Sequence, residues 1–334
     1  MSKRTIGIFL LCLSGLLAGR LAAAEPVQPY RITMVLFRGC EEACKGFQDY
    51  WRTRKIPVDI EVLDAALDVG KIPGFISRVK ARKPDLLVTW GTTVSLAMLG
   101  TTRDVDPARH ITDIPALFMI ASTPVGSGLV DSLAGSKRNI SGTLYLVPVE
   151  TQINAARLYL PFKRIGYLLN PSEDNSRVIH ADLLAARSKS KFELITRQVG
   201  LDAAGKPDKT SLARLIGELA KDKIDFLYMA PDTFLLVNRD IVTGTALQHG
   251  VPVLASAEAA VIGSNALFGV VNRYYTVGQL TASRAEQILV GKVAPKDIPI
   301  VAPPSFSYIV NMRVASELER YPSIAVLKIA EIVR

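Results

Sequence analysis

The chain alternates between short, continuous apolar runs and longer stretches in which apolar residues recur every three or four positions. In the first half these patterns predict strand 31–37, helix 40–54, strand 58–63, helix 73–83, strand 85–90, helix 92–99 and strand 115–121. Continuous apolar strands that are each followed by a helix indicate a parallel sheet covered on both faces. This half therefore predicts a doubly wound α/β lobe.

The alternation starts again after residue 148 and predicts a second α/β lobe. Its elements are helix 149–159, strand 164–169, helix 172–189, strand 192–199, helix 209–221, strand 225–229, helix 234–248 and strand 251–255. The tail adds helix 276–290, a proline-rich crossing over 295–304, strand 308–312 and a last helix. We expect short crossings near 145–148 and 270–274, a ligand cleft between the facing strand ends, and hinge closure.

These patterns divide the chain into a leader and two lobes. We assign 1–24 to the leader, 25–147 plus about 271–300 to the N-terminal lobe, and 148–270 plus about 301–334 to the C-terminal lobe. In the leader, Lys3 and Arg4 precede an apolar run over 6–18, and three alanines end at Ala24. This is the pattern of a secretory signal peptide, and the run is shorter than the roughly 20 residues of a membrane span. We expect cleavage near Ala24 and a periplasmic location; the alternative is an uncleaved anchor.

The composition, 49% hydrophobic and 21% charged, is that of a globular protein and excludes disordered, collagen-like and coiled-coil classes. The net charge of +9 first suggests a nucleic-acid partner. However, the leader holds three bases and no acid, so the mature chain would carry +6. The remaining Lys and Arg residues are scattered without an aromatic-interleaved basic stripe, so we expect no nucleic-acid binding.

Removal of the leader would leave two cysteines, Cys40 and Cys44, in a compartment that permits disulfides. Positions four apart on a regular helix lie near the upper Cα limit for a bridge, so a bond requires Cys40 to precede the helix proper. The spacing is not Cys-x-x-Cys, which disfavours a redox pair and leaves a local staple or two free thiols.

The sequence contains no clear catalytic or metal motif. His110, His180 and His249 lie in separate predicted elements, without a partner at metal-ligand spacing. We therefore expect no cofactor, no metal and no enzyme activity. The enzymatic alternative is an exported hydrolase or isomerase that uses Glu173 and Asp232 as an acid–base pair.

Polar loops follow the predicted strands of both lobes and supply the candidate binding residues. These are Gly91, Thr92, Thr93, Ser122 and Thr123 in the first lobe, and Asn170, Ser172, Glu173, Asn175, Ser176, Asp232, Thr233 and Glu258 in the second. Each loop alone is also explained by helix capping. Together, the hydroxyls and N–H groups of the first lobe suit a carboxylate, and the acids of the second suit an ammonium. The pattern predicts a zwitterion such as an amino acid.

Three aromatic residues next to these loops are candidates for stacking on an aromatic ligand: Phe37, Trp90 and Tyr274. For each, the alternative is packing in the core.

The same loops resemble a known family. The stretches KPDLLVTWGTTVSLA (83–97), TPVGSGLVDSL (123–133) and RIGYLLNPSEDNS (164–176) resemble segments of periplasmic substrate-binding proteins of ABC importers related to tryptophan/tyrosine-binding components. Further segments continue the resemblance in order over most of 31–330. It implies a type I periplasmic binding fold and capture of a small ligand for an inner-membrane permease. Thr93 and Thr123 depart from the family's proline and aspartate, and the loop over 38–40 is unlike the commoner members.

From the two lobes, the leader and the resemblance, we expect a monomer whose partners are a small molecule and an inner-membrane ABC permease. The ligand expected is an aromatic amino acid or a similar zwitterion or carboxylate. Two alternatives remain: a sensor that docks on a receptor or kinase ectodomain, and a binding protein for a molecule other than an amino acid.

Overall fold

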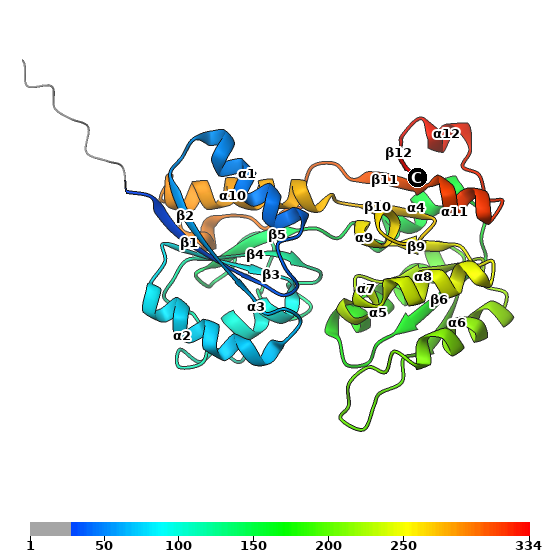
Figure 1. Ribbon diagram of the computed structural model, residues 1–334, viewed down its shortest axis with the longest axis horizontal. Helices are drawn as coiled ribbons and strands as arrows, with labels where there is room; N and C mark the ends of the chain where they lie inside the picture. Colours follow the sequence, from blue (N-terminus) through cyan, green and yellow to red (C-terminus); the bar gives the residue numbers. More distant parts are fainter. Residues whose placement is uncertain (1–27) are drawn as a thin grey trace, which may run out of the picture.

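The computed structural model describes residues 28–334, which form two α/β lobes side by side (Figure 1). The leader predicted over 1–24 lies outside the described residues. Both lobes are sheets with helices on their faces, as the alternation of apolar runs and amphipathic stretches predicts. None of the helices in the described part is long and apolar enough to cross a membrane.

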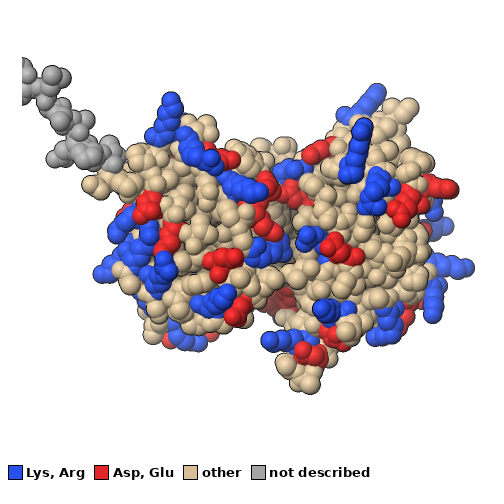
Figure 2. Space-filling view, viewed as in Figure 1, with Lys and Arg blue, Asp and Glu red and all other residues tan. Residues whose placement is uncertain are grey.

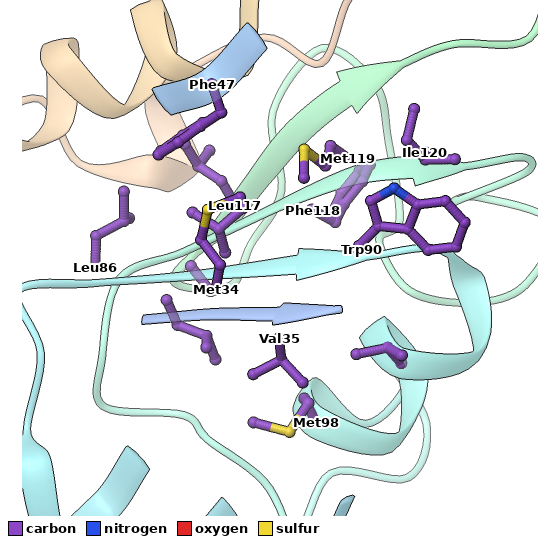
Figure 3. Close-up of a cluster of buried hydrophobic side chains, with 14 of the residues drawn as sticks. Met34, Val35, Phe47, Leu86, Trp90, Met98, Leu117, Phe118, Met119 and Ile120 are labelled. Carbon is purple, nitrogen blue, oxygen red and sulfur yellow. The ribbon is translucent and has the colours of Figure 1, made fainter. Parts of the chain in front are cut away.

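The N-terminal lobe contains a five-stranded parallel sheet in the order β2-β1-β3-β4-β5. Its strands are β1 (Tyr30–Leu36), β2 (Val58–Asp64), β3 (Leu86–Trp90), β4 (Ala116–Ala121) and β5 (Ile140–Leu144). Its helices are α1 (Glu42–Arg54), η1 (Val69–Lys71), α2 (Ile72–Arg82), α3 (Thr92–Leu99), α10 (Tyr274–Leu289) and η2 (Pro295–Asp297). The central strands are buried on both faces, and Figure 3 shows this core, with Trp90 at one end of it.

The C-terminal lobe contains a seven-stranded sheet in the order β12-β11-β10-β9-β8-β6-β7. Its strands are β6 (Arg164–Leu169), β7 (Glu193–Gln198), β8 (Phe226–Met229), β9 (Val253–Ala255), β10 (Phe268–Val271), β11 (Ser307–Asn311) and β12 (Ala330–Val333). Its helices are α4 (Val149–Tyr159), α5 (Asp174–Lys189), α6 (Ser211–Lys221), α7 (Thr233–Val237), α8 (Arg239–Gln248), α9 (Glu258–Ile262), α11 (Met312–Glu317) and α12 (Ile324–Leu327).

One pair of strands departs from the parallel sheet that the sequence predicts. Strand β11 runs antiparallel to β10, while the other pairs in both sheets are parallel. The reason is the path of the chain: after β10 it leaves for the other lobe, forms α10 there, and returns from the hinge side. A strand that re-enters from the side at which its neighbour left must run in the opposite direction.

Helix α10 belongs to the N-terminal lobe although it follows ten strands and nine helices in the chain, counted over residues 28–334. It packs along α1, with Gly46 and Gly278 at the contact. A Cβ on Gly46 would overlap the carbonyl oxygen of Tyr275, and a Cβ on Gly278 would overlap that of Ala43. Glycine at both positions therefore allows the two helix backbones to touch.

Besides strand β10, two features of the C-terminal lobe were not predicted from sequence. The helix expected over 234–248 is divided at Asn238, which separates α7 from α8 and whose side-chain amide donates to the carbonyl of Phe234. Asparagine competes in this way with the regular helical bonds. Strand β12 is formed within the stretch expected to be the last helix.

The chain passes between the lobes three times, over 145–148, 272–273 and 298–306. The crossings are tied to one another: Asn272 Nδ2 donates to the carbonyl of Tyr145 at 2.9 Å, and Thr143 bridges to Val301. The three crossings therefore run side by side and form the hinge between the two lobes.

Candidate functional site

Each sheet has one point at which the strand order reverses, and the two points face each other across the hinge. In the N-terminal lobe β1 lies between β2 and β3, so the loops after β1 and β3 leave on opposite faces of the sheet. In the C-terminal lobe β6 lies between β7 and β8, so the loops after β6 and β8 do the same. Such switch points are where open α/β sheets bind ligands. We call them the N-switch (37–41 and 90–93) and the C-switch (170–173 and 230–233).

The lobes touch beside these points. Thr92 Oγ1 donates to Asn175 Oδ1 at 3.1 Å, which joins the start of α3 to the start of α5. A Cβ on Gly126 would lie 3.3 Å from a methyl group of Val178, so the backbone after β4 also approaches α5 closely. The structure therefore shows the lobes in contact, as in a closed form.

The C-switch holds two carboxyl groups, and one of them is incompletely paired. Asp232 is fully buried; its Oδ1 accepts from the Leu235 N–H at 2.7 Å, and its Oδ2 has no hydrogen-bond partner within residues 28–334. Glu173 accepts from the N–H and hydroxyl of Thr233 at 2.9–3.0 Å and from Asn175 Nδ2 at 3.1 Å. Burial, and then repulsion by Glu173, raise the pKa of Asp232 well above its ordinary value. A cation placed at Oδ2 would relieve both causes.

The rest of the turn after β6 shapes the loop. Asn170 Oδ1 accepts from the N–H of Ser172 at 3.1 Å and from its hydroxyl at 2.8 Å. Ser176 Oγ accepts from the Asn170 N–H at 2.9 Å. These three residues hold the turn that presents Glu173 and Asn175, and the Ser172 side chain is exposed to solvent.

Two of the candidate hydroxyls of the N-terminal lobe, those of Thr92 and Ser122, are bonded to other protein groups. Besides its bond to Asn175, Thr92 Oγ1 accepts from the Ser122 N–H at 3.3 Å. The Ser122 hydroxyl is bonded to Tyr145 OH at 2.8 Å. Gly91 takes a φ of +82° as the N-cap of α3, a conformation that favours glycine. Thr123 keeps a buried hydroxyl without a partner in the described chain.

A cavity of about 400 Å³ lies where α3 meets the loop before α5. It is lined by Thr92, Thr93, Leu96, Ala97, Ser172, Glu173, Asp174 and Asn175. The structure thus brings the threonine turn of one lobe and the asparagine turn of the other together at a single opening. Figure 2 shows acidic side chains recessed between the lobes.

The N-switch contains a cation that was not among the binding residues predicted from sequence. The guanidinium carbon of Arg38 lies 4.8 Å from the centre of the Trp90 ring, and Arg38 Nε donates to Glu41 Oε1 at 2.8 Å. Although burial acts to lower the pKa of Arg38, Tyr274 and Glu41 outweigh it and the pKa is raised. The only signal in the sequence was that the loop over 38–40 differs from the commoner family members.

The predicted aromatic residues have different surroundings. Phe37 is part of the N-terminal core, 9% exposed. Trp90 and Tyr274 are also buried, but Trp90 Nε1 and Tyr274 OH have no hydrogen-bond partner in the described part of the chain. Tyr274 packs edge-to-face on Tyr145, with ring centres 5.6 Å apart. Trp90 and Tyr274 therefore combine an apolar ring with an unused polar atom.

Tyr145, also absent from the sequence prediction, lies between the charges of the two lobes. Burial raises its pKa, the hydrogen bond from Ser122 and the Arg38 charge oppose this, and Glu173 and Asp232 add to it. The ring packs on Tyr274, and the hydroxyl is bonded to Ser122 at 2.8 Å. It stands at the end of β5, where the first crossing starts.

The disulfide Cys40–Cys44 lies directly behind Arg38, with 5.1 Å between the Cα atoms. Because α1 begins at Glu42, Cys40 precedes the helix, which is the condition that the spacing requires. Cys44 is buried and Cys40 is exposed. The bond fastens the loop after β1 to the first turn of α1.

Glu258 differs from the expectation that it faces an ammonium. Its Oε2 lies 2.7 Å from Arg273 Nε, and its Oε1 accepts from the Tyr274 N–H at 3.1 Å. Burial raises the pKa of Glu258, and Arg273 opposes that rise. The carboxylate is therefore occupied at the start of α10, next to the second crossing, and belongs to the hinge.

Comparison with known proteins agrees with this architecture. A curated tyrosine-binding protein of Clostridioides difficile is 26% identical over 269 residues, which is 80% of this chain and 71% of that protein. An ABC domain in complex with L-Trp from Streptococcus pneumonia superimposes with a TM-score of 0.75 at 23% identity, covering 91% of this chain and 100% of the other. A conserved domain protein from Vibrio cholerae gives a TM-score of 0.78 at 20% identity, with coverage of 92% and 100%.

The structural neighbours show a type I periplasmic binding fold, as the resemblance implied. No group of three or more His, Cys, Asp or Glu residues arranged to hold a metal is found within residues 28–334. The family model for the ABC transporter substrate binding protein matches residues 36–333. The chain belongs to this family of ABC transporter substrate-binding proteins, which is not a class of enzymes.

Proposed function

We propose that the protein is the periplasmic binding component of an ABC importer and captures an aromatic amino acid when its lobes close. The observation that carries this proposal is the buried Oδ2 of Asp232, which has no partner in the described chain. A buried carboxylate is costly unless a cation or hydrogen-bond donor reaches it. The ammonium of an amino acid is a small cation with three donors and meets that need.

The facing side of the cleft suits the rest of such a ligand. Trp90 lies against Arg38 in the N-switch, and Tyr145 and Tyr274 pack edge-to-face next to the crossings. Aromatic rings pack favourably on one another edge-to-face or offset. Two of the similar proteins are associated with ligands of this class: one is a tyrosine-binding protein, and the other was solved in complex with L-Trp. Both support an aromatic side chain for the ligand of this protein.

The contact between Thr92 and Asn175 gives closure a structural basis. It joins the two lobes through residues next to the switch points, so a ligand bound by both lobes favours the form in which this bond is made. We propose that an inner-membrane permease recognises this closed form, and that the leader over 1–24 directs the monomeric protein to the periplasm.

The test is calorimetric titration of the purified protein with L-tyrosine, L-tryptophan, L-phenylalanine, L-leucine and L-glutamate. We expect saturable binding of at least one aromatic amino acid. At a hundredfold excess over Kd, bound ligand adds about 2.7 kcal/mol to the free energy of unfolding, which raises Tm by several degrees. If none of the five binds at millimolar concentration, the amino-acid function is wrong.

The importer role is tested separately, by uptake of the labelled amino acid in cells that lack this protein. We expect uptake to fall and to recover with the wild-type chain but not with Asp232→Asn. Unchanged uptake with intact binding in vitro would contradict transport and favour a sensing role.

A further inference from the structure

The guanidinium of Arg38 is held on two sides and open on the third. One face lies over Trp90, and Nε is bonded to Glu41. No hydrogen bond from Nη1 or Nη2 to another residue is found within residues 28–334, and 12% of the side chain remains exposed. Arginine presents its donors as a rigid planar fork that matches a carboxylate with two parallel bonds. The open edge of Arg38 therefore has both the geometry and the unused donors for such a partner.

The position of this open edge is that of a ligand contact. Arg38 follows β1 and Trp90 ends β3, so the pair occupies the switch point of the N-terminal sheet. The carboxyl groups of Glu173 and Asp232 occupy the corresponding point of the other sheet. Tyr145 links the two points: its ring packs on Tyr274, and its hydroxyl is bonded to Ser122, whose N–H donates to Thr92 next to the contact with Asn175. A ligand in the cleft would thus meet a cation on one side and carboxyls on the other.

Two of the hydroxyls expected from sequence to hold a carboxylate are already used by other protein groups. The Thr92 hydroxyl is used by Asn175 and the Ser122 N–H, and the Ser122 hydroxyl by Tyr145. The hydroxyls of Thr93 and Thr123 have no partner within residues 28–334 and remain as single neutral donors. A second set of donors without a partner in that range, which carries a positive charge, consists of the outer nitrogens of Arg38 and the buried Trp90 Nε1 and Tyr274 OH. These lie together at the loop after β1, the end of β3 and the start of α10.

We infer that Arg38 binds the carboxylate of the ligand and makes an acid group a requirement for tight binding. This inference rests on the proposed function, because it names the group that the same cleft recognises. Glu41 and Trp90 fix the plane of the guanidinium, and the Cys40–Cys44 disulfide fastens the loop that carries it. Asp232 then selects the ammonium, and Arg38 selects the acid.

The test uses three probes that differ in their charged groups: L-tyrosine, which has both; tyramine, which lacks the carboxylate; and 3-(4-hydroxyphenyl)propionate, which lacks the ammonium. The dissociation constants are measured for wild type, Arg38→Gln and Arg38→Lys. Arg157→Gln is the matched control, because Arg157 also lies over an aromatic ring, 4.2 Å from the centre of Phe162, but outside the cleft.

For Arg38→Gln we expect tyrosine and the propionate to bind at least tenfold more weakly, while the affinity for tyramine changes less than twofold. Arg38→Lys keeps the charge without the fork and should lose about threefold to tenfold. Arg157→Gln should leave all three constants unchanged. Circular dichroism and the Tm of each variant establish whether it is folded. If Arg38→Gln is unfolded, the dissociation constants of Arg38→Lys are compared with those of wild type instead.

Three outcomes would overturn the inference. Equal losses for tyrosine and tyramine in Arg38→Gln would show a structural role only. Unchanged tyrosine binding would show that the carboxylate lies elsewhere, with the amino-acid function intact. Binding of none of the probes to wild type would remove this inference, and the amino-acid function would then be decided by the titrations with the other four amino acids. Conversely, propionate binding that depends on Arg38 but not on Asp232 would uphold the inference and contradict the ammonium site.

Discussion

The two switch points are built from opposite chemistry on similar sheets. The N-switch presents a cation stacked on an aromatic ring, and its charge is partly balanced by Glu41. The C-switch presents two acids, of which Glu173 is bonded to the start of α7 and Asp232 keeps a buried oxygen unpaired. The two points therefore differ in charge balance: the C-terminal lobe holds a buried carboxyl oxygen without a partner in residues 28–334, whereas the N-terminal lobe holds an ion pair and donors that make no further bond there.

The largest effect should come from removing the charge of the C-switch. In Asp232→Asn the amide oxygen can still cap α7 through the Leu235 N–H, but the partner of the ammonium is lost. Loss of a charged hydrogen bond of this kind costs about 2–3 kcal/mol, so calorimetry should show L-tyrosine binding roughly 30-fold to 150-fold more weakly. The ligand-free variant should have a higher Tm than wild type at pH 7, because a strained buried acid is removed.

Asp208→Asn is the control for that change. Asp208 also accepts from a backbone N–H at the start of a helical turn, that of Thr210, but it lies on the surface. It should alter neither binding nor Tm by more than a small amount. A similar loss of affinity in both variants would contradict the assignment of Asp232 to the ligand.

Removing the disulfide of the N-switch should mainly affect stability. For the short loop closed by Cys40 and Cys44, chain entropy alone gives about 2 kcal/mol. In the double variant Cys40→Ser/Cys44→Ser, the free energy of unfolding should be lower by that amount. The urea midpoint should fall accordingly, while the dependence of the free energy on urea stays unchanged. Reduced wild type should have the same urea midpoint as the double variant. If the midpoint of the double variant equals that of oxidised wild type, the disulfide does not stabilise the protein.

The affinity should depend on pH through Asp232. Burial and Glu173 raise its pKa above the ordinary 3.8, so the folded, ligand-free protein binds this proton more tightly than the unfolded chain. Its contribution to stability is therefore lost as pH rises from about 3.8 through the raised pKa. An ammonium prefers the ionised carboxyl, so the affinity for L-tyrosine should increase over the same range. Titrations in buffers of different ionisation enthalpy should show proton release in wild type and none in Asp232→Asn.

The smallest effect should come from the bond between the lobes. Thr92→Val removes the hydroxyl that joins Asn175 and should weaken ligand binding by roughly fivefold, the equivalent of about 1 kcal/mol of closure. Thr151→Val is the matched control, since Thr151 lies on α4, does not line the cavity, and its hydroxyl makes no hydrogen bond within residues 28–334. If both variants lose the same affinity, the hydrogen bond between Thr92 and Asn175 does not contribute to closure.

The alternation of apolar runs was enough to predict the two-lobed α/β architecture, because buried parallel strands leave continuous hydrophobic segments. It missed β5 and β10, whose sequences contain glycine and, in β5, hydroxyl residues, so that neither forms an unbroken apolar run. It also could not give the direction of β11, which follows from the path of the chain through the other lobe.

The sequence predicted which loops form the candidate site, because these loops follow strands. It did not predict which polar groups in the loops remain free, because their partners come from distant parts of the chain. The loops after β3, β6 and β8 were identified from their place after strands. Which of their polar groups remain free depends on Asn175, Tyr145 and Arg38, brought together only by the closed lobes. For the same reason, the pairing of Glu258 with Arg273 could not be read from the sequence.

The three passages of the chain between the lobes also bear on when the protein can fold. The N-terminal lobe lacks α10 until residue 289 has been made, and the C-terminal sheet lacks its last two strands until residue 333. A growing chain usually completes its N-terminal domain first, but here the N-terminal lobe is complete only after most of the C-terminal lobe has been made. A polypeptide that reaches its final shape only as a whole stays available, throughout its synthesis, to machinery that handles unfolded chains.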